Sequence, residues 1–226
     1  MEVIEWPDVV ADFDAEVVAA LEATRQHLTD ERAEAHRQLT GVLASDRAQT
    51  LLASWSAWLD GPDPEGGYPE RSAAEPIGAL MAKRIRRAHR RLVHAGRAIT
   101  PDTPAAQVHE LRKDAKKLRY LLECFGGLYA PGPRKRFVAR LKALQDLLGT
   151  HQDADVAVTR LRDEAASARA AGWPAPSLLA IGQLIERHDR RRQAMRLEVG
   201  ERFDDFDSAP TRRALDDLLD SERPAP

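Results

Sequence analysis

The stretch that decides the fold is VHELRKDAKKLRYLLECF, from Val108 to Phe125. At 100° per residue it predicts an amphipathic helix, with an apolar seam made of Leu111, Ala115, Leu118, Leu122 and Phe125. The cationic stripe lies opposite and comprises His109, Arg112, Lys113, Lys116 and Tyr120, flanked by Lys117 and Arg119. Thr103 and Pro104 suit the start of this helix, and Gly126-Gly127 ends the pattern.

The stripe has few acids to balance its cations. A solvated helix face normally mixes signs, with Glu and Lys four residues apart supporting each other. Here the acids are only Glu110, Asp114 and Glu123. Like charges four residues apart repel, so the pattern costs local stability unless an anion compensates it. We interpret the stripe as an anion-binding face, and a merely solvated face is the alternative.

A second helix has the same design. Pro76 opens it, and Met81, Ile85, Ala88 and Leu92 form its seam. The other side carries Lys83, Arg86, Arg87, Arg90, His94 and Arg97. Two such helices packed side by side would direct both stripes into one groove.

The net charge of −2 conceals a strong asymmetry along the 226 residues. Residues 83–142 carry 17 Lys or Arg and 4 Asp or Glu, whereas the segments on either side are net acidic. Such a block between acidic flanks indicates an anionic partner. The chain is rich in Ala, Leu, Arg and Glu and has no alternating strand pattern, so helix is favoured throughout.

The order of apolar helix faces and helix-ending residues along the sequence predicts an all-α protein of antiparallel helical bundles. We expect helices at 13–28, from Thr29 to about 42, at 45–59, 76–97, 104–125, 134–148, 153–171 and 177–200. Gly149 is expected to end the 134–148 helix, and the segment 61–75 is expected to be the longest loop. The predicted domains are a partial N-terminal helical repeat at 1–75, a basic bundle at 76–200 and an acidic, mobile tail at 201–226. Within the tail, one short helix is expected around Arg212 to Leu219.

Other classes of protein find no support in the sequence. It contains no apolar run long enough to span a membrane and no signal peptide, so we expect a cytoplasmic protein. Cys124 is the only cysteine and is expected to pack as a small hydrophobe beside the seam. Nucleotide-loop, nucleophile-elbow and H-E-x-x-H motifs are absent. His151, Asp153 and Asp155 do not converge well enough for a metal, so we expect no catalytic residue, metal or cofactor.

Residue types and spacing around the stripe resemble those of the CHAD family, the conserved-histidine α-helical domains. The resemblance rests on His109-x-x-Arg112-Lys113-x-x-Lys116-x-Leu118-Arg119-Tyr120, then Leu141-Lys-x-Leu144-Gln145-Asp146-x-Leu148-Gly149, then Asp153. It is strongest over about 104–160. The family has two helical repeats, and no counterpart of its first His-x-x-Arg helix precedes residue 83. The N-terminal repeat is therefore expected to be incomplete.

The family binds inorganic polyphosphate, so the resemblance implies that this chain binds polyphosphate without catalysis in a groove lined by Lys, Arg and His. The positions that match the family are His109, Arg112, Lys113, Lys116 and Arg119. From the pattern of cationic stripes we add Lys83, Arg87, Arg90 and Lys142. The E-x-E-x-K signature of the associated triphosphatases is missing, so an enzyme is not implied. Association with polyphosphate granules is a further expectation.

Three alternatives remain open. The block could bind nucleic acid, although only Tyr120 offers a stacking aromatic on the stripe. It could dock an acidic protein, including the chain's own tail after residue 200. It could be an accessory part of a system that hydrolyses phosphoanhydrides, which would need carboxylates holding Mg²⁺ near the stripe. For His109, an anion contact and a hydrogen bond within the bundle are both open.

Overall fold

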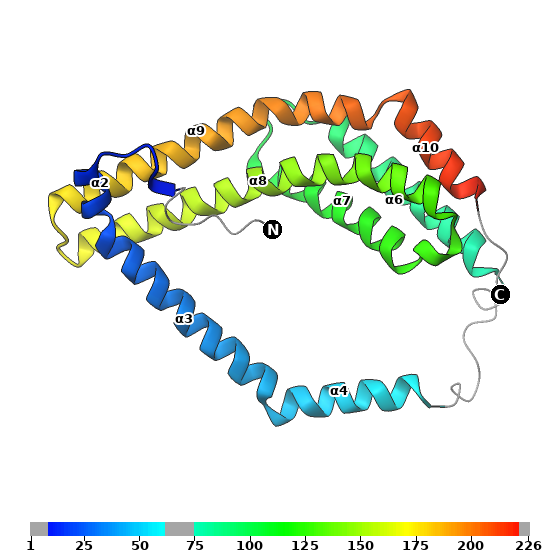
Figure 1. Ribbon diagram of the computed structural model, residues 1–226, viewed down its shortest axis with the longest axis horizontal. Helices are drawn as coiled ribbons and strands as arrows, with labels where there is room; N and C mark the ends of the chain where they lie inside the picture. The colour runs from blue at the N-terminus through cyan, green and yellow to red at the C-terminus, as the bar shows by residue number, and fades with distance from the viewer. Residues whose placement is uncertain (1–8, 62–74, 222–226) are drawn as a thin grey trace. The chain divides into compact units, whose positions relative to one another are not determined.

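The computed structural model of the chain describes residues 9–61 and 75–221, and their regular elements are all helical (Figure 1). Their order is α2 (Ala15–Ala20), α3 (Glu22–Ala44), α4 (Asp46–Leu59), α6 (Ile77–Arg97), α7 (Ala105–Cys124), η1 (Gly126–Leu128), α8 (Pro131–Ala170), α9 (Ala175–Phe206) and α10 (Ala209–Asp220). The all-α prediction is confirmed. Across the described residues, no helix combines the length and the apolar character needed to span a membrane.

The chain divides into two compact units. The N-terminal unit comprises residues 1–69 and 161–185, and the main unit comprises 70–160 and 186–226. The hairpin formed by α8 and α9 therefore contributes its tip to the N-terminal unit and its remainder to the main unit. The loop predicted at 61–75 falls almost entirely on residues 62–74, which lie outside the described residues.

The main unit has one hydrophobic core to which α6, α7, α8, α9 and α10 contribute. The predicted seam of α7 is confirmed, because Leu111, Ala115, Leu118 and Leu122 are fully buried and Phe125 is half-buried. The seam of α6 is buried at Met81, Ile85 and Leu92 as well. Fully buried partners on α8 are Phe137, Leu141, Leu144 and Leu148. The apolar spacing thus positions α7 so that its cationic stripe faces away from this core.

The two helices predicted at 134–148 and 153–171 form one continuous helix, α8, of 40 residues. The prediction that Gly149 ends a helix was wrong. A glycine in a helix interior costs only about 1 kcal/mol relative to alanine. Burial continues past it at Ala154, Val158 and Leu161, so packing on both sides of Gly149 outweighs the local cost.

The tail prediction was right about a short helix around Arg212 to Leu219, which lies within α10, but wrong about mobility over the rest of the described residues. Residues 201–206 complete α9 and residues 209–220 form α10. Their apolar side chains belong to the main core, namely Phe203, Phe206, Leu215, Leu218 and Leu219. Most acidic residues of this segment are exposed, namely Asp204, Asp205, Asp216, Asp217 and Asp220. Asp207, in the turn between α9 and α10, pairs with Arg97 and Arg212.

At the N-terminus, the predicted helix break at Thr29 is absent, because α3 runs unbroken from Glu22 to Ala44. The Thr29 hydroxyl donates a hydrogen bond to the Arg25 carbonyl at 2.7 Å, one turn back, instead of capping a new helix. The chain breaks earlier, at Leu21, which is fully buried and separates α2 from α3. Ser45 does begin a helix as predicted, since its Oγ accepts from the Ala48 N–H.

The N-terminal unit has a smaller core and a long exposed apolar surface. Its buried side chains are Leu21, Leu161, Ala168, Ala180, Ile181 and Leu184. The apolar positions of α4 and the end of α3 are instead 55–66% exposed, and they are Leu39, Val42, Leu43, Leu51, Leu52, Trp55, Trp58 and Leu59. Periodicity therefore predicted these helices correctly although their apolar residues are not buried.

A fall in pH is expected to destabilise the main unit through His89. Its ring is buried between Phe137 and Phe206, with centroid distances of 6.0 and 5.7 Å. This burial lowers the pKa of His89, so the native state keeps the imidazole neutral. Below an unfolded pKa of about 6.5 the unfolded state binds more protons. The contribution of neutral His89 to the stability of the native state is therefore complete above the unfolded pKa. It is lost as the pH falls toward the lower pKa of the folded state.

Thermal unfolding of the full chain between about pH 7.5 and 5.5 checks this expectation. The Tm of the wild type should fall more over this range than that of His89→Leu, in which the buried titrating group is gone. Burial also lowers the pKa of His151 and His188, so some pH dependence of the same sign should persist in the variant. Equal losses of Tm in the two proteins would contradict the role given to His89.

Candidate functional site

The cationic stripe of α7 lies on a helix flanked by α6 and α8, and two contacts fix the register of the three helices. Arg91 Nε of α6 lies 2.9 Å from both carboxylate oxygens of the buried Asp114 of α7. His109 Nδ1 of α7 lies 2.7 Å from Gln152 Oε1 of α8. Because each neighbouring pair is antiparallel, these contacts define which residues of α6 and α8 lie opposite the stripe.

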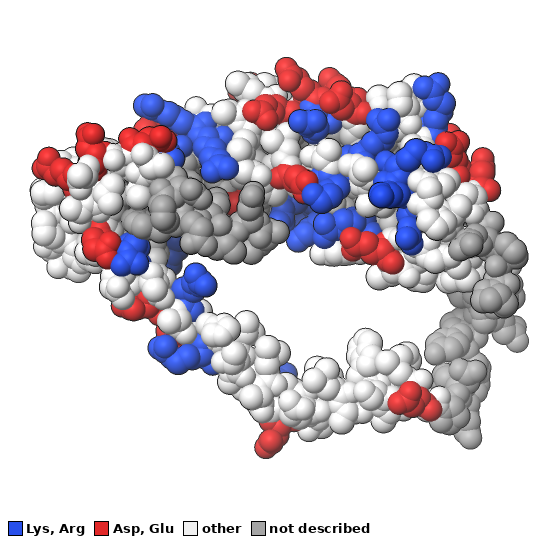
Figure 2. Space-filling model, viewed as in Figure 1, with Lys and Arg blue, Asp and Glu red and all other residues white. Residues whose placement is uncertain are grey.

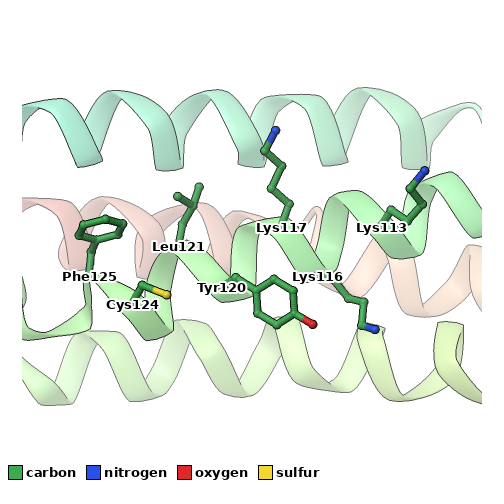
Figure 3. A pocket seen from close by; sticks show the side chains of 7 residues that line it. All are labelled: Lys113, Lys116, Lys117, Tyr120, Leu121, Cys124 and Phe125. Atoms are coloured by element: carbon green, nitrogen blue, oxygen red, sulfur yellow. The ribbon is translucent and has the colours of Figure 1, made fainter. Parts of the chain in front are cut away.

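Three lysines of α7 spread over the outer side of the helix (Figure 3). Lys113 and Lys117 extend toward α6, whereas Lys116 extends on the side of α8. Figure 2 shows that Lys and Arg side chains gather over the main unit on this face, with a few Asp and Glu among them. The stripe predicted from the sequence is therefore a real surface that projects ammonium groups to both sides of α7.

A shallow hollow of about 400 Å³ lies between these lysines and the end of α7. Its lining consists of Lys113, Lys116, Lys117, Tyr120, Leu121, Cys124 and Phe125 (Figure 3). The prediction that Cys124 is packed was wrong, because it is exposed and lines this hollow. The seam turns inward through Leu122, so the residues on either side of it face outward. The hollow combines an apolar floor with cationic walls.

The cations of the α7 stripe and its flanks differ in whether a nearby acid already neutralises them. Lys113 Nζ pairs with Glu110 at 2.9 Å, and this ammonium holds the pKa of Glu110 below its usual range. Arg119 Nε lies 3.2 Å from Glu123 Oε1, close enough for an ion pair but without hydrogen-bond geometry. Arg112, Lys116 and Lys117 have no acidic partner within the described residues. These three carry the uncompensated positive charge of α7.

On α6, the register selects a set of cations that overlaps only partly with the predicted set. Arg91 adjoins α7, and Arg84 and Arg87 lie on the same side of the helix at spacings of seven and four residues. Measured from Arg91 at about 100° per residue, Lys83 and Arg90 lie 80–100° round the α6 axis. Lys83 also pairs with Glu75. Sequence reasoning included Arg87 but missed Arg84 and Arg91, whose position only the Asp114 contact reveals.

Lys142 of α8 lies opposite Arg119. It stands ten residues before Gln152, and Arg119 stands ten residues after His109, so the antiparallel register brings the two to the same level. Lys142 Nζ is held 2.7 Å from Asp146 Oδ2 on its own helix. It therefore extends the basic surface onto α8 but carries less free charge than Lys116.

His109 makes a hydrogen bond within the bundle. Its partner is the side-chain amide of Gln152 and not a backbone carbonyl. The residue is half-buried, so the bond fixes the ring at the junction of α7 and α8, beside Arg112. The two roles left open by the sequence remain compatible, because this bond engages only one of the two ring nitrogens.

The cluster His151, Asp153 and Asp155 does not form a site. His151 is buried and Asp153 is exposed, which places them on different sides of α8. Asp155 Oδ1 instead accepts from Arg192 Nη1 of α9 at 2.8 Å. Its carboxylate therefore helps to join α8 to α9.

Two acids near the end of the described residues pair with cations outside the α7 stripe. Asp207 pairs with Arg97 on the other side of α6, and Asp217 lies 3.4 Å from Arg136 of α8. Because α9 and α10 are part of the core, the hypothesis that a mobile acidic tail docks on the stripe was wrong for the described residues.

Comparison with known families agrees with this architecture. The family model described as CHAD domain matches residues 5–162 of the 226 residues, a span that includes α6, α7 and most of α8. No curated protein gives a significant match to the chain. The family match covers more than half of the sequence and includes every residue of the cationic stripe. The chain therefore belongs to the CHAD family.

Proposed function

We propose that the chain binds inorganic polyphosphate, without catalysis, on the α7 surface between α6 and α8. The family is linked to polyphosphate binding, which supports this class of ligand. The observation that carries the proposal is the set of cations on α7 with no acidic partner among the described residues, Arg112, Lys116 and Lys117. We include in the proposal a cytoplasmic location and association with polyphosphate granules.

A flexible polyanion suits this surface better than a compact ligand does. Each phosphate of a polyphosphate carries about one negative charge, so one flexible polyphosphate can contact cations on several turns of α7. Arg112 offers paired N–H donors to phosphate oxygens, and Lys116 offers a compact point charge. Release of condensed counterions, a principle stated for nucleic acids, should make the affinity strongly dependent on salt.

Nucleic acid is the second candidate, and the hollow gives it one specific feature. Tyr120 is 47% exposed at the edge of the hollow, and Arg119 Cζ lies 5.5 Å from its ring centroid. A single aromatic offers one stacking position, whereas single-strand binders place successive bases on several. Competition between polyphosphate and a single-stranded RNA for the same protein separates the two candidates.

Titration of long-chain polyphosphate into the full chain by calorimetry at two salt concentrations tests the proposal. The affinity should fall with salt, and Arg112→Glu/Lys116→Glu should lower it at least about tenfold and reduce the salt slope by about two. Both side chains are half-buried at most, so the variant is expected to fold. Phosphate release in the presence of Mg²⁺, measured on the same samples, would instead favour a hydrolytic role.

A second basic hollow in the main unit supplies the matched control. It lies between α8 and α10 and is lined by Arg136, Ala139, Arg140, Ala143, Pro210, Arg213, Ala214 and Asp217. Arg140→Glu/Arg213→Glu changes the net charge by the same amount as the test variant and should leave most of the affinity intact. Loss of binding in this control alone would move the site to α10, and no binding by folded wild type would refute the proposal.

A further inference from the structure

Three side chains that could bind a metal converge in the N-terminal unit. His27 and Glu31 lie one turn apart on α3, and Glu164 projects from the tip of the α8–α9 hairpin. Their ligand atoms all lie within 4.8 Å of one another. Among the described residues, no other group of three His, Cys, Asp or Glu side chains comes this close together.

The distances match those that one small cation requires. His27 Nε2 lies 3.4 Å from Glu164 Oε2 and 3.8 Å from Glu31 Oε1. Zinc bonds of about 2.0–2.2 Å in a tetrahedron place neighbouring ligand atoms about 3.3–3.6 Å apart. Small side-chain movements would therefore bring all three atoms into a zinc coordination shell and leave a fourth position for water.

The burial of Glu164 is an independent reason to expect a cation. Its side chain is 3% exposed, and the core residues Leu161 and Ala168 lie three residues before it and four residues after it on the same side of α8. A buried carboxylate is costly unless a cation or hydrogen bonds compensate it. Among the described residues, the ion-pair partner of Glu164 is His27, which is positive only when protonated.

The surroundings also hold the imidazole in place. The Trp173 ring packs edge-on against His27, with centroids 6.4 Å apart. The imidazole presents Nε2 to both carboxylates, so the same nitrogen could bind a metal together with them. Because one ligand is a histidine nitrogen, the set suits zinc better than calcium or magnesium, which prefer oxygen ligands.

We propose that His27, Glu31 and Glu164 form a zinc-binding site that joins α3 to the α8–α9 hairpin. The metal would link two segments that are 133 or more residues apart in the sequence, as a structural cross-link within the N-terminal unit. This site is independent of the proposed polyphosphate surface, whose residues all belong to the main unit. The competing account is an ion pair between protonated His27 and Glu164 with no metal.

Titration of ZnCl₂ alone into the metal-free full chain, by calorimetry, decides between the two. We expect one zinc per chain, and a Tm that rises with zinc concentration because the metal binds only the native site. His27→Gln and Glu164→Gln should both lose this binding while keeping similar side-chain volumes. Magnesium at the same concentration should produce neither effect.

The matched control is His36→Gln, which removes an exposed histidine from the same helix outside the cluster. It should bind zinc like the wild type, and circular dichroism should show all variants to be equally helical. Polyphosphate affinity should be unchanged in His27→Gln, so failure of one proposal is distinguishable from failure of the other. Absence of zinc binding at one site per chain, or its retention in both cluster variants, would leave only the ion pair.

Discussion

Replacing Gly96 by alanine is expected to destabilise the main unit by about 1–3 kcal/mol. Gly96 is buried in the last turn of α6, where the ring of Phe203 from α9 lies directly over its Cα. A Cβ at this position would overlap the Cε2, Cζ and Cδ2 atoms of that ring. The ring has little room to retreat, because Phe203 is buried and packs against Phe206 with centroids 6.4 Å apart.

Gly149→Ala is the matched control and should have the opposite sign. Gly149 lies inside α8, and a Cβ there would meet nothing within 4 Å. Alanine reduces the freedom of the unfolded chain and favours helix, so a gain of about 0.5–1 kcal/mol is expected. Urea denaturation of both variants measures the two changes, and a loss of stability in Gly149→Ala would show that the continuous helix is under strain there.

Truncating Leu218 to alanine is expected to cost about 2–5 kcal/mol, although the residue lies only eight positions before the last residue of the sequence. Leu218 of α10 is fully buried and belongs to the same core as Leu118 and Phe137. The neighbouring Leu215 and Leu219 are buried with it. The cavity left by the lost methyl groups would therefore open inside the main core and not at a frayed end.

Leu197→Ala provides the comparison, because Leu197 of α9 is 64% exposed and its truncation should change stability by less than about 0.5 kcal/mol. The denaturation midpoints of the two variants measure the difference directly. If Leu218→Ala were as mild as Leu197→Ala, α10 would contribute little to the core. The same reasoning predicts that removing residues 207–226 unfolds the main unit, so such a truncation cannot test polyphosphate binding.

The helices of the main unit could be predicted because their seams are strongly periodic. The spacing of Leu111, Ala115, Leu118 and Leu122 allows only one side of α7 to be buried. The ends of the helices were predicted less well. Gly149 and Thr29 are plausible ends in isolation, yet tertiary packing continues the helix past both. Local signals compete with burial, and burial of a continuous seam is worth more than the cost of one glycine.

The candidate site, like the helices, could be predicted from the sequence only in part. Charge clustering alone located the stripe on α7, because charge is visible in the sequence. Which cations remain unpaired depends on contacts such as Arg91 with Asp114, and these follow from the register of two helices. The candidate metal site was missed because it joins His27 to Glu164, which are far apart in the sequence, and because the predicted break at Thr29 separated His27 from Glu31.

The division of the N-terminal unit into residues 1–69 and 161–185 constrains how the protein can evolve. Its second segment is the tip of a hairpin whose two helices continue without interruption into the main unit. A single recombination crossover therefore cannot exchange one unit for a homologous one. A crossover near residue 70 would leave Leu161, Ile181 and Leu184 facing α2 and α3 of a different parent. The two units must be inherited together, and substitutions on the hairpin tip must be compensated at the opposite end of the gene.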